Sequence, residues 1–425
     1  MTARPPPDEP VVARLRNGVH VVHLPTPQRA TACASVFVRS GSAHEPRTLN
    51  GIGHFIEHMA FKGTTTRDAR RINLDAERLG AEVLAHTDKD HTAFQMRGLA
   101  EHALDFVRML ADIVRRPTFP ADELERERQV LLHEFAEVDD DPMDTAYRLF
   151  DHACFGLHPA AQPVIGTRAH IERITRADLL GYVQRQYSGA NVVVGVAADA
   201  DPAAVLRAVD AAFGDMAEGA AHTVAATPYR GDVRTRALSG SNQAHLLIGG
   251  ALPPLAADDA TGTVAAAVLG EGMSSPLLLR VREQRALAYH ATCAADVLDV
   301  CGQFVVEAST APEGLDDCAR EVAALLHAHA RRVDPVDLER AQRQLRVRRL
   351  RAAEKPLQRL EDAALDLFSF GRVRTLDEQL ERLDAVGADA VRAQFERLIA
   401  DGLSAVAVGH VGRAAGERLR NALKG

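Results

Sequence analysis

The feature that most constrains the fold is an order of secondary structure that occurs twice along the chain. Residues 11–40 alternate apolar and polar side chains, which predicts strands, and residues 49–61 change to helical spacing. A strand pair at about 80–99, helices and a strand at 192–199 follow. After residue 240 the same order begins again. Low identity between the halves favours duplicated architecture over a repeat array. We therefore predict an α+β protein of two similar domains, each a mainly antiparallel sheet covered by helices.

The boundary between the predicted domains lies in a stretch rich in Gly, Ala, Thr and Ser. Residues 215–241 lack long apolar periodicity and contain Pro228, which is typical of a linker. We predict an N-terminal domain over residues 1–220, a linker over 221–235 and a C-terminal domain over 236–425. The length of 425 residues agrees with this division, because a domain typically contains about 100–200 residues.

Composition excludes several classes of partner. The formal net charge is −8, which gives no reason to expect nucleic acid or an acidic membrane surface. No apolar run approaches the ~20 residues that span a bilayer. Residues 1–10 are proline-rich and lack the apolar segment of a secretory signal, so we expect a cytoplasmic bacterial protein. Five widely spaced cysteines argue against a disulfide framework and against a cysteine zinc site.

The sharpest motif is GIGHFIEHMAFKG, which contains His54, Glu57 and His58. On a helix these three residues share one face. Two imidazoles one turn apart can bind a single zinc ion, and Glu57 is placed to act as the general base toward the attacking water. The order is H-x-x-E-H, the inverse of the commoner zinc motif. A polar helix face without metal is the alternative at this point.

A third ligand can come from the segment DELERERQVLLHEFAEV. Leu131 and Phe135 mark its apolar stripe, and Glu127 and Glu134 fall on or next to that stripe. A carboxylate on a buried face is costly unless it is paired or bound to metal. The alternative is that both glutamates belong to an exposed charged face.

Together these segments resemble the pitrilysin family of zinc metallopeptidases (family M16, the inverzincins). The family includes insulin-degrading enzyme, the mitochondrial processing peptidase and small two-domain bacterial peptidases. The resemblance is carried by HFIEHMAFKGT and ERERQVLLHE, and family-like segments extend over about residues 15–200 and 240–410. It implies half of a clamshell peptidase that binds one Zn²⁺ per chain. The implied zinc ligands are His54, His58 and Glu134, with Glu57 as general base and Glu127 as a support behind the ligands.

The resemblance continues in LGEGMSSPLLLRVREQRALAY. It implies that Arg282 and Tyr289, on the second domain, hold the substrate carbonyl and stabilise the oxyanion. Without it, Arg282 is a solvated helix charge and Tyr289 an aromatic residue at the start of a strand.

One segment departs from the family pattern. The edge strand that receives the peptide usually reads N-A-[FY]-T, whereas this chain has Leu84-Ala85-His86-Thr87. Backbone pairing with the substrate through Ala85 should survive, because strand addition uses main-chain groups. The side-chain amide expected at position 84 is missing, which affects substrate positioning. The histidines and aspartates over residues 86–91 are interpreted as a polar turn rather than as a second metal site.

The sequence therefore predicts a zinc-dependent endopeptidase that cleaves extended peptides or small unfolded polypeptides. The substrates would be either general oligopeptides or dedicated precursor peptides. The alternative is a non-catalytic peptide-binding or scaffolding subunit. By the resemblance, the partner is a second chain, in a homodimer or in a heterodimer with a related family subunit.

Overall fold

The computed structural model describes residues 9–27 and 29–424. The chain divides into two compact units. Unit 1 runs up to Phe135 and also takes residues 162–225 and 352–375, and unit 2 contains the rest. Residues 1–8, on which most of the expectation about a secretory signal rests, lie outside the described residues.

The sheet of unit 1 has six strands in the spatial order β1-β2-β6-β3-β5-β4. Their bounds are β1 Val11–Arg14, β2 His20–Pro25, β3 Thr31–Val38, β4 Glu82–Thr87, β5 Thr92–Leu99 and β6 Val192–Ala198. Only the neighbours β2 and β6 run parallel. The turn at Asn17-Gly18 joins β1 to β2, with Gly18 at φ 93° in the left-handed region that favours glycine. Strand β4 forms one edge of this sheet.

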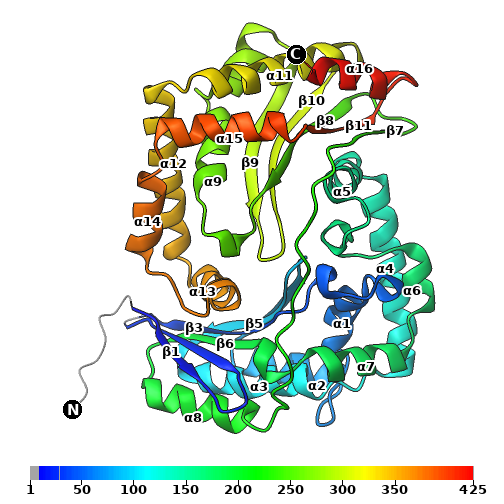
Figure 1. The fold of residues 1–425 in the computed structure, drawn as a ribbon. Helices are drawn as coiled ribbons and strands as arrows, with labels where there is room; N and C mark the ends of the chain where they lie inside the picture. The colour runs from blue at the N-terminus through cyan, green and yellow to red at the C-terminus, as the bar shows by residue number, and fades with distance from the viewer. Residues whose placement is uncertain (1–8, 28, 425) are drawn as a thin grey trace. The chain divides into compact units, whose positions relative to one another are not determined.

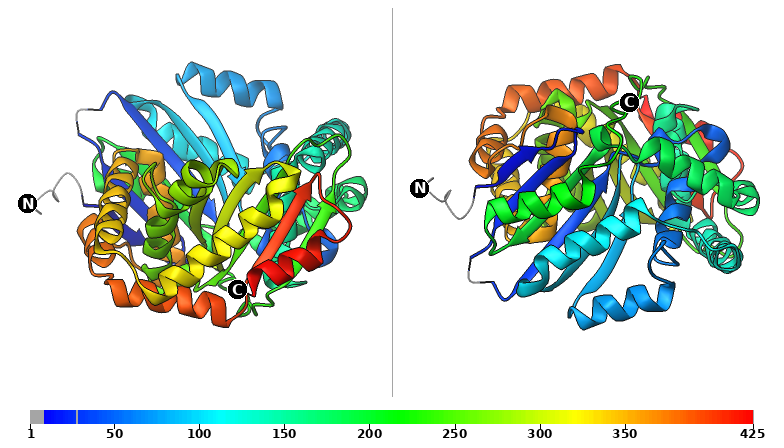
Figure 2. Two further views of the ribbon diagram at one scale, coloured as in Figure 1. Left: turned by 90° about the horizontal axis from the view of Figure 1, so that it is seen from above. Right: turned by 90° about the horizontal axis from the view of Figure 1, so that it is seen from below.

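Helices cover both faces of the unit 1 sheet. Figures 1 and 2 show α3 and α8 lying against one face, and α13 covers the other. The helices of this unit are α1 Ile52–Ala60, α2 Ala69–Arg78, α3 Ala103–Arg115, α4 from Ala121, α6 Arg168–Arg173, α7 Arg176–Gln186, α8 Pro202–Phe213 and α13 Pro356–Phe370. Because both faces are covered, the central strand β6 is buried along its whole length. Its Gly195 leaves room for Leu360 of α13, which a Cβ would approach to 2.9 Å.

The sheet of unit 2 has five strands in the order β7-β11-β8-β10-β9, of which only β7 and β11 pair in parallel. Its strands are β7 Val233–Ala237, β8 Ala244–Leu252, β9 Ala288–Val297, β10 Gly302–Thr310 and β11 Ser404–Gly409. Its helices are α5 Pro142–Phe155, α9 Thr261–Gly270, α10 Pro276–Leu278, α11 Leu315–Arg331, α12 Pro335–Ala353, α14 Leu376–Asp384, α15 Ala388–Ala400 and α16 Ala415–Leu423. Helix α4 ends at Asp140, at the start of this unit.

Two helices, α5 and α13, do not pack in the unit formed by their neighbours along the chain. Helix α5 follows the first zinc-motif segments in sequence, yet its Phe150 and Cys154 belong to a core cluster with Leu247 and Val406 of unit 2. Helix α13 comes late in the chain, yet it packs on the unit 1 sheet. Each helix buries a sheet face that would otherwise be apolar and exposed.

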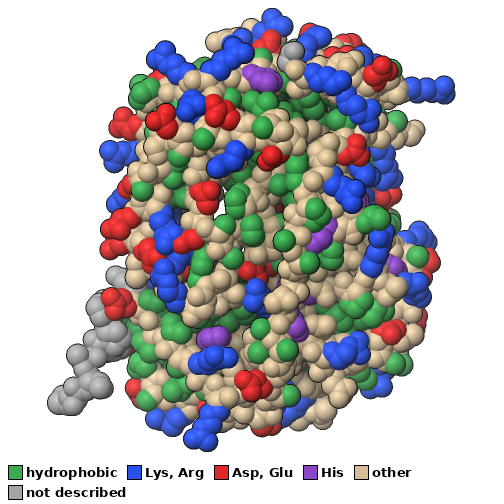
Figure 3. Space-filling view, in the orientation of Figure 1, with side chains coloured by type: hydrophobic (Ala, Val, Ile, Leu, Met, Phe, Trp, Pro, Cys, Tyr) green, Lys and Arg blue, Asp and Glu red, His purple; other side chains and the backbone are tan. Residues whose placement is uncertain are grey.

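The predicted fold class is confirmed, with a mixed but mainly antiparallel sheet covered by helices in each unit. All five cysteines are free and buried, as expected for small core residues. Within the described residues, no helix combines the length and the apolar character needed to cross a membrane. Figure 3 shows acidic and basic side chains interspersed on the visible face.

Candidate metal centre and active site

Helix α1 carries the H-x-x-E-H motif, and a buried carboxylate fixes its N-terminus. Glu45 accepts hydrogen bonds from the backbone N–H groups of Gly51 and Gly53, each at 2.7 Å, and from the side-chain amide of Asn50 at 2.8 Å. Hydrogen-bond acceptors at this end favour the helix, because its free N–H groups point toward them. Burial raises the pKa of Glu45 to about 8, and the hydrogen bonds from Gly51, Gly53 and Asn50 oppose that shift. Gly51 precedes the helix at φ 96°, a conformation that favours glycine.

The motif residues emerge on the face of α1 opposite its core. Ile52, Phe55 and Met59 are fully buried in the main cluster of unit 1. His54, Glu57 and His58 lie on the remaining face and are partly exposed, as the helical spacing predicts. The buried stripe therefore holds the helix, and the motif face stays open to solvent.

The structure brings both histidines to Glu134 of α4. His54 Nε2 lies 3.6 Å from Glu134 Oε1, and His58 Nε2 lies 3.5 Å from Glu134 Oε2. Ligand atoms of a tetrahedral zinc ion, at ~2.0–2.1 Å from the metal, are about 3.3 Å apart. Burial, together with the neighbouring His58, lowers the pKa of His54 to about 4, so its imidazole is neutral and can coordinate. These three side chains, all within ligand reach of one another, fit a zinc ion.

Glu127 stands behind His58. Its Oε2 lies 3.2 Å from His58 Nδ1, and its Oε1 lies 2.7 Å from the Lys62 ammonium. With Nδ1–H donating to Glu127, the other ring nitrogen of His58 is left free to coordinate. Such carboxylate partners fix the tautomer of a ligand histidine and raise its basicity. This is the geometry of the role predicted for Glu127, and Lys62 balances the charge of its buried carboxylate.

Glu57 is held by strand β4. The Thr87 hydroxyl donates a 2.7 Å hydrogen bond to Glu57 Oε2. Burial raises the pKa of Glu57, and the Thr87 hydrogen bond and electrostatic interactions with His58 and His86 oppose that shift. A carboxylate with a raised pKa is better matched to proton transfer near neutral pH than an ordinary glutamate.

Strand β4 is an edge strand of the sheet, and its last residue, Thr87, reaches this site. It pairs on one side with β5, where Ala85 lies opposite Phe94, and within residues 9–27 and 29–424 no strand pairs with its other side. The Leu84 side chain is exposed to 38%. An edge strand of this kind can accept an extended peptide as an added strand.

Unit 2 brings Arg282 and Tyr289 together. Arg282 lies in a π-helical segment, Leu279–Gln284, and Tyr289 is the second residue of β9, with 85% of its surface exposed. The Arg282 guanidinium carbon is 5.0 Å from the centre of the Tyr289 ring, and Arg282 also contacts Glu283. Short π-helical segments occur often at functional sites, because they redirect side chains.

Both halves of the chain match known sequence families. The family described as Insulinase (Peptidase family M16) matches residues 20–168, and Peptidase M16 inactive domain matches residues 173–345. An uncharacterized zinc protease of Mycobacterium tuberculosis is 31% identical over 402 residues, which cover 93% of this chain and 92% of that relative. The chain belongs to peptidase family M16. An uncharacterized zinc protease of Bacillus subtilis is 28% identical over 389 residues, 91% of this chain and 95% of that protein.

Solved structures share the M16 fold. A protease from Helicobacter pylori has a TM-score of 0.85 at 20% identity and covers 94% of this chain and 99% of its own. A chain of Complex III2 from Candida albicans has a TM-score of 0.83 at 17% identity, over 97% of this chain and 99% of its own. At these identities the likeness shows the fold alone. The resemblance proposed from the sequence motifs is confirmed at the level of the family.

Several residues that build this site carried no signal on their own in the sequence. Glu45 contacts the start of the motif helix, Thr87 contacts Glu57, and Lys62 contacts Glu127 behind the histidines. A Cβ on Gly53 would approach Glu45 Oε1 to 2.9 Å, and this close contact is visible only in the structure.

Proposed function

We propose that this M16 protein is a zinc-dependent endopeptidase acting on extended peptides. The observation that carries the proposal is the convergence of His54, His58 and Glu134 beside Glu57, whose carboxylate is bonded to the edge strand β4. A metal-ligand set, a general base and a strand able to receive a peptide backbone are thus parts of one unit. The zinc protease names of the M16 relatives support the same class of reaction.

The residues divide the chemistry among them. When bound, Zn²⁺ acts as a Lewis acid that lowers the pKa of water and polarises a peptide carbonyl. Glu57 takes a proton from the attacking water and delivers it to the leaving amine. Main-chain groups of β4, Ala85 among them, align the substrate as an added strand. Arg282 and Tyr289 donate to the oxyanion that forms on the carbonyl.

The substrates we propose are peptides or small unfolded polypeptides, because strand addition needs a free backbone. They include precursor peptides as one class. The working form we propose is a dimer, either of two copies or with a related family subunit.

Mass spectrometry of a mixture of unstructured peptides tests the proposal on the full chain. Zinc-loaded wild type should cleave internal bonds. Glu57→Gln should keep its zinc, because the ligands are untouched, and should lose several orders of magnitude of turnover. His327→Ala, a helix histidine outside the site, serves as the control and should behave as wild type. Retention of more than about a tenth of wild-type kcat in Glu57→Gln would remove Glu57 from the role of base.

A second candidate function is a non-catalytic peptide-binding subunit, which Leu84 at the position of the family asparagine favours. This reading expects peptide affinity without cleavage. Wild type that binds peptides as tightly as Glu57→Gln, yet yields no products with a full complement of zinc, would support the binding subunit over the enzyme.

A further inference from the structure

A second group of potential metal ligands lies in unit 1, away from His54, His58 and Glu134. It consists of His86 on β4, His91 in the turn before β5, and Glu361 on α13, and it is called the second cluster below. His86 Nε2 lies 3.3 Å from Glu361 Oε1, and His91 Nε2 lies 3.4 Å from the same oxygen. The local sequence favoured a polar turn here, because Glu361 is far away along the chain.

The separations of the donor atoms fit a small metal ion. Two imidazole nitrogens and one carboxylate oxygen form the donor set that zinc prefers. Their distances of 3.3 and 3.4 Å match the ~3.3 Å expected between ligand atoms on a tetrahedral zinc ion. By this measure the second cluster is at least as well formed as the first site, where the corresponding distances are 3.6 and 3.5 Å.

His91 is prepared for coordination by its other ring nitrogen. His91 Nδ1 lies 2.6 Å from Asp90 Oδ1, and the two side chains are only 3% and 1% exposed. The His91 Nε2 atom is buried and lies 3.4 Å from Glu361 Oε1. Burial lowers the pKa of His91, but Asp90 and Glu361 outweigh it and raise that pKa to about 10 without a metal, so a bound cation must displace the Nε2 proton. Metal-binding histidines commonly donate their second N–H to a carboxylate in this way. Asp90 thus contacts Nδ1 of His91 in the same way that Glu127 contacts Nδ1 of His58 in the first site.

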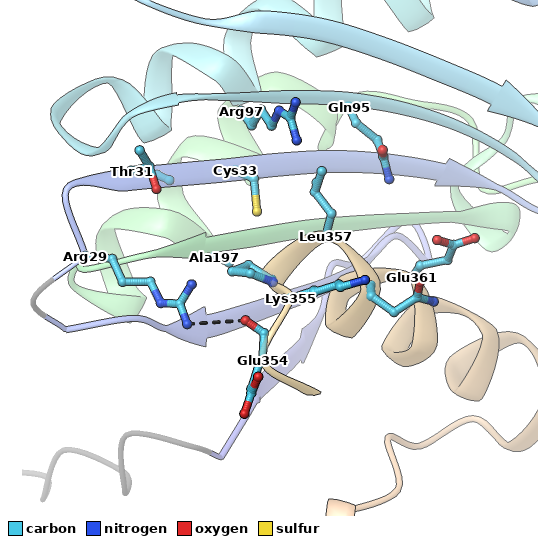
Figure 4. A pocket seen from close by; sticks show the side chains of 13 residues that line it. Arg29, Thr31, Cys33, Gln95, Arg97, Ala197, Glu354, Lys355, Leu357 and Glu361 are labelled. Carbon is cyan, nitrogen blue, oxygen red and sulfur yellow. Dashed lines mark hydrogen bonds between the residues drawn. The ribbon is translucent and has the colours of Figure 1, made fainter. Parts of the chain in front are cut away.

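The second cluster can be reached by a cation from solvent. The His86 side chain is 40% exposed. A cavity of about 420 Å³ lies between the sheet and the start of α13, and Figure 4 shows Glu361 at one end of it and Arg29 at the other. Ligand type, the separation of the donor atoms, an outer carboxylate and an access path are among the properties by which a metal site is recognised in a structure.

We infer that the second cluster binds a divalent, nitrogen-preferring cation such as Zn²⁺, and that this ion fastens α13 to the β4–β5 hairpin. Alternate side chains of a strand point to opposite faces, so His86 and the neighbouring Thr87 lie on opposite sides of β4. Thr87 contacts Glu57, whereas His86 contacts α13. The second ion would therefore have a structural role and would share no ligand with the first site. It would link α13 to β4, the strand that orients the general base.

Metal analysis of the purified full chain tests this inference. Wild type should hold two zinc ions per chain, and His58→Ala and Glu361→Gln should each hold one. The double variant should hold none. Glu354→Gln, which lines the same cavity outside the cluster, is the matched control and should keep two. One zinc per wild-type chain that is unchanged in Glu361→Gln would show that only ion pairs hold the second cluster, and would overturn the inference.

A spectroscopic measurement keeps the test independent of folding and of peptidase activity. Co²⁺ added to the His58→Ala chain should give the visible absorption of a tetrahedral nitrogen–oxygen site. The absorption should disappear in His58→Ala/His91→Asn, and Asp90→Asn should weaken Co²⁺ binding by about 10–100-fold. The same Co²⁺ spectrum with and without His91→Asn would contradict the assignment. Loss of one zinc in Glu361→Gln but none in His58→Ala would keep the second site and remove the first.

Discussion

The Thr87 hydroxyl donates a 2.7 Å hydrogen bond to the carboxylate of Glu57, which links the edge strand β4 directly to the proposed general base on α1. The strand proposed to receive the substrate backbone thus also holds the group proposed to activate water. Displacement of β4 would therefore alter substrate alignment and the position of the base together.

Removing this hydroxyl should change the pH dependence of cleavage. Burial raises the pKa of Glu57, and the Thr87 hydrogen bond lowers it by favouring the charged form. Thr87→Val keeps the shape and loses the bond, so the pKa should rise further. Because the base must be deprotonated, the acid limb of kcat/KM should move to higher pH. Thr31→Val, a strand threonine exposed at the start of β3, should leave the profile in place. An unshifted limb in Thr87→Val would separate Thr87 from the base.

The two glutamates of α4 should differ in their effect on zinc. Glu134 lies near the Nε2 atoms of both histidines, whereas Glu127 contacts only Nδ1 of His58, the ring nitrogen that would face away from the zinc. Glu134→Gln should weaken zinc binding far more than Glu127→Gln, which should cost about 10–100-fold. Competition with a fluorescent chelator measures both constants. Equal losses of zinc affinity in the two variants would contradict the assignment of Glu134 as the ligand and Glu127 as its support.

Arg282 and Tyr289 should act on the reaction without acting on the metal. Arg282→Ala and Tyr289→Phe should keep the zinc content of wild type and lower kcat/KM by roughly 10²–10³ each, as for oxyanion donors. Arg285→Ala is the control, because Arg285 directly follows the π-helical segment and pairs with Glu321. Activity near that of the control in both variants would leave the Arg282–Tyr289 pair with a purely structural role.

Glu45 should matter for stability and for the metal site together. Glu45→Ala leaves the N–H groups of Gly51 and Gly53 buried without their acceptor, which should lower the free energy of unfolding by about 2–4 kcal/mol. Zinc affinity should fall as well, because α1 carries both histidines. Urea unfolding and zinc titration measure the two effects. Glu77 is an exposed glutamate of α2, and Glu77→Ala should change the free energy of unfolding by less than about 0.5 kcal/mol. A similarly small effect of Glu45→Ala would show that Glu45 does not hold the start of α1.

Residue spacing was sufficient for the parts of the candidate site that lie on one helix. His54, Glu57 and His58 share a face because the helix repeats every 3.6 residues, and the buried stripe of α1 fixes which face is free. Spacing was not sufficient to place Glu134, because its separation from the motif along the chain does not determine its distance from the histidines in the folded protein. Resemblance to family M16 supplied that pairing, and the structure places Glu134 at both histidines.

The exchange of α5 and α13 between the units had no local signal. Each is an ordinary amphipathic helix, and its pattern says that one face is buried but not against what. A cut in the predicted linker at 221–235 would separate α13 from the apolar sheet face that contains Val22, Phe37 and Val193. Tests of the domains are therefore best made on the full chain.

The sequence by itself determined the elements, the fold class and the H-x-x-E-H face, because these follow from periodicity over a few turns or strands. Tertiary structure alone decided that Thr87 meets Glu57, that Lys62 balances Glu127, and that Glu361 reaches His91. Each of these contacts joins elements whose relative placement depends on how whole apolar faces pack. No spacing between two residues along the chain encodes that packing.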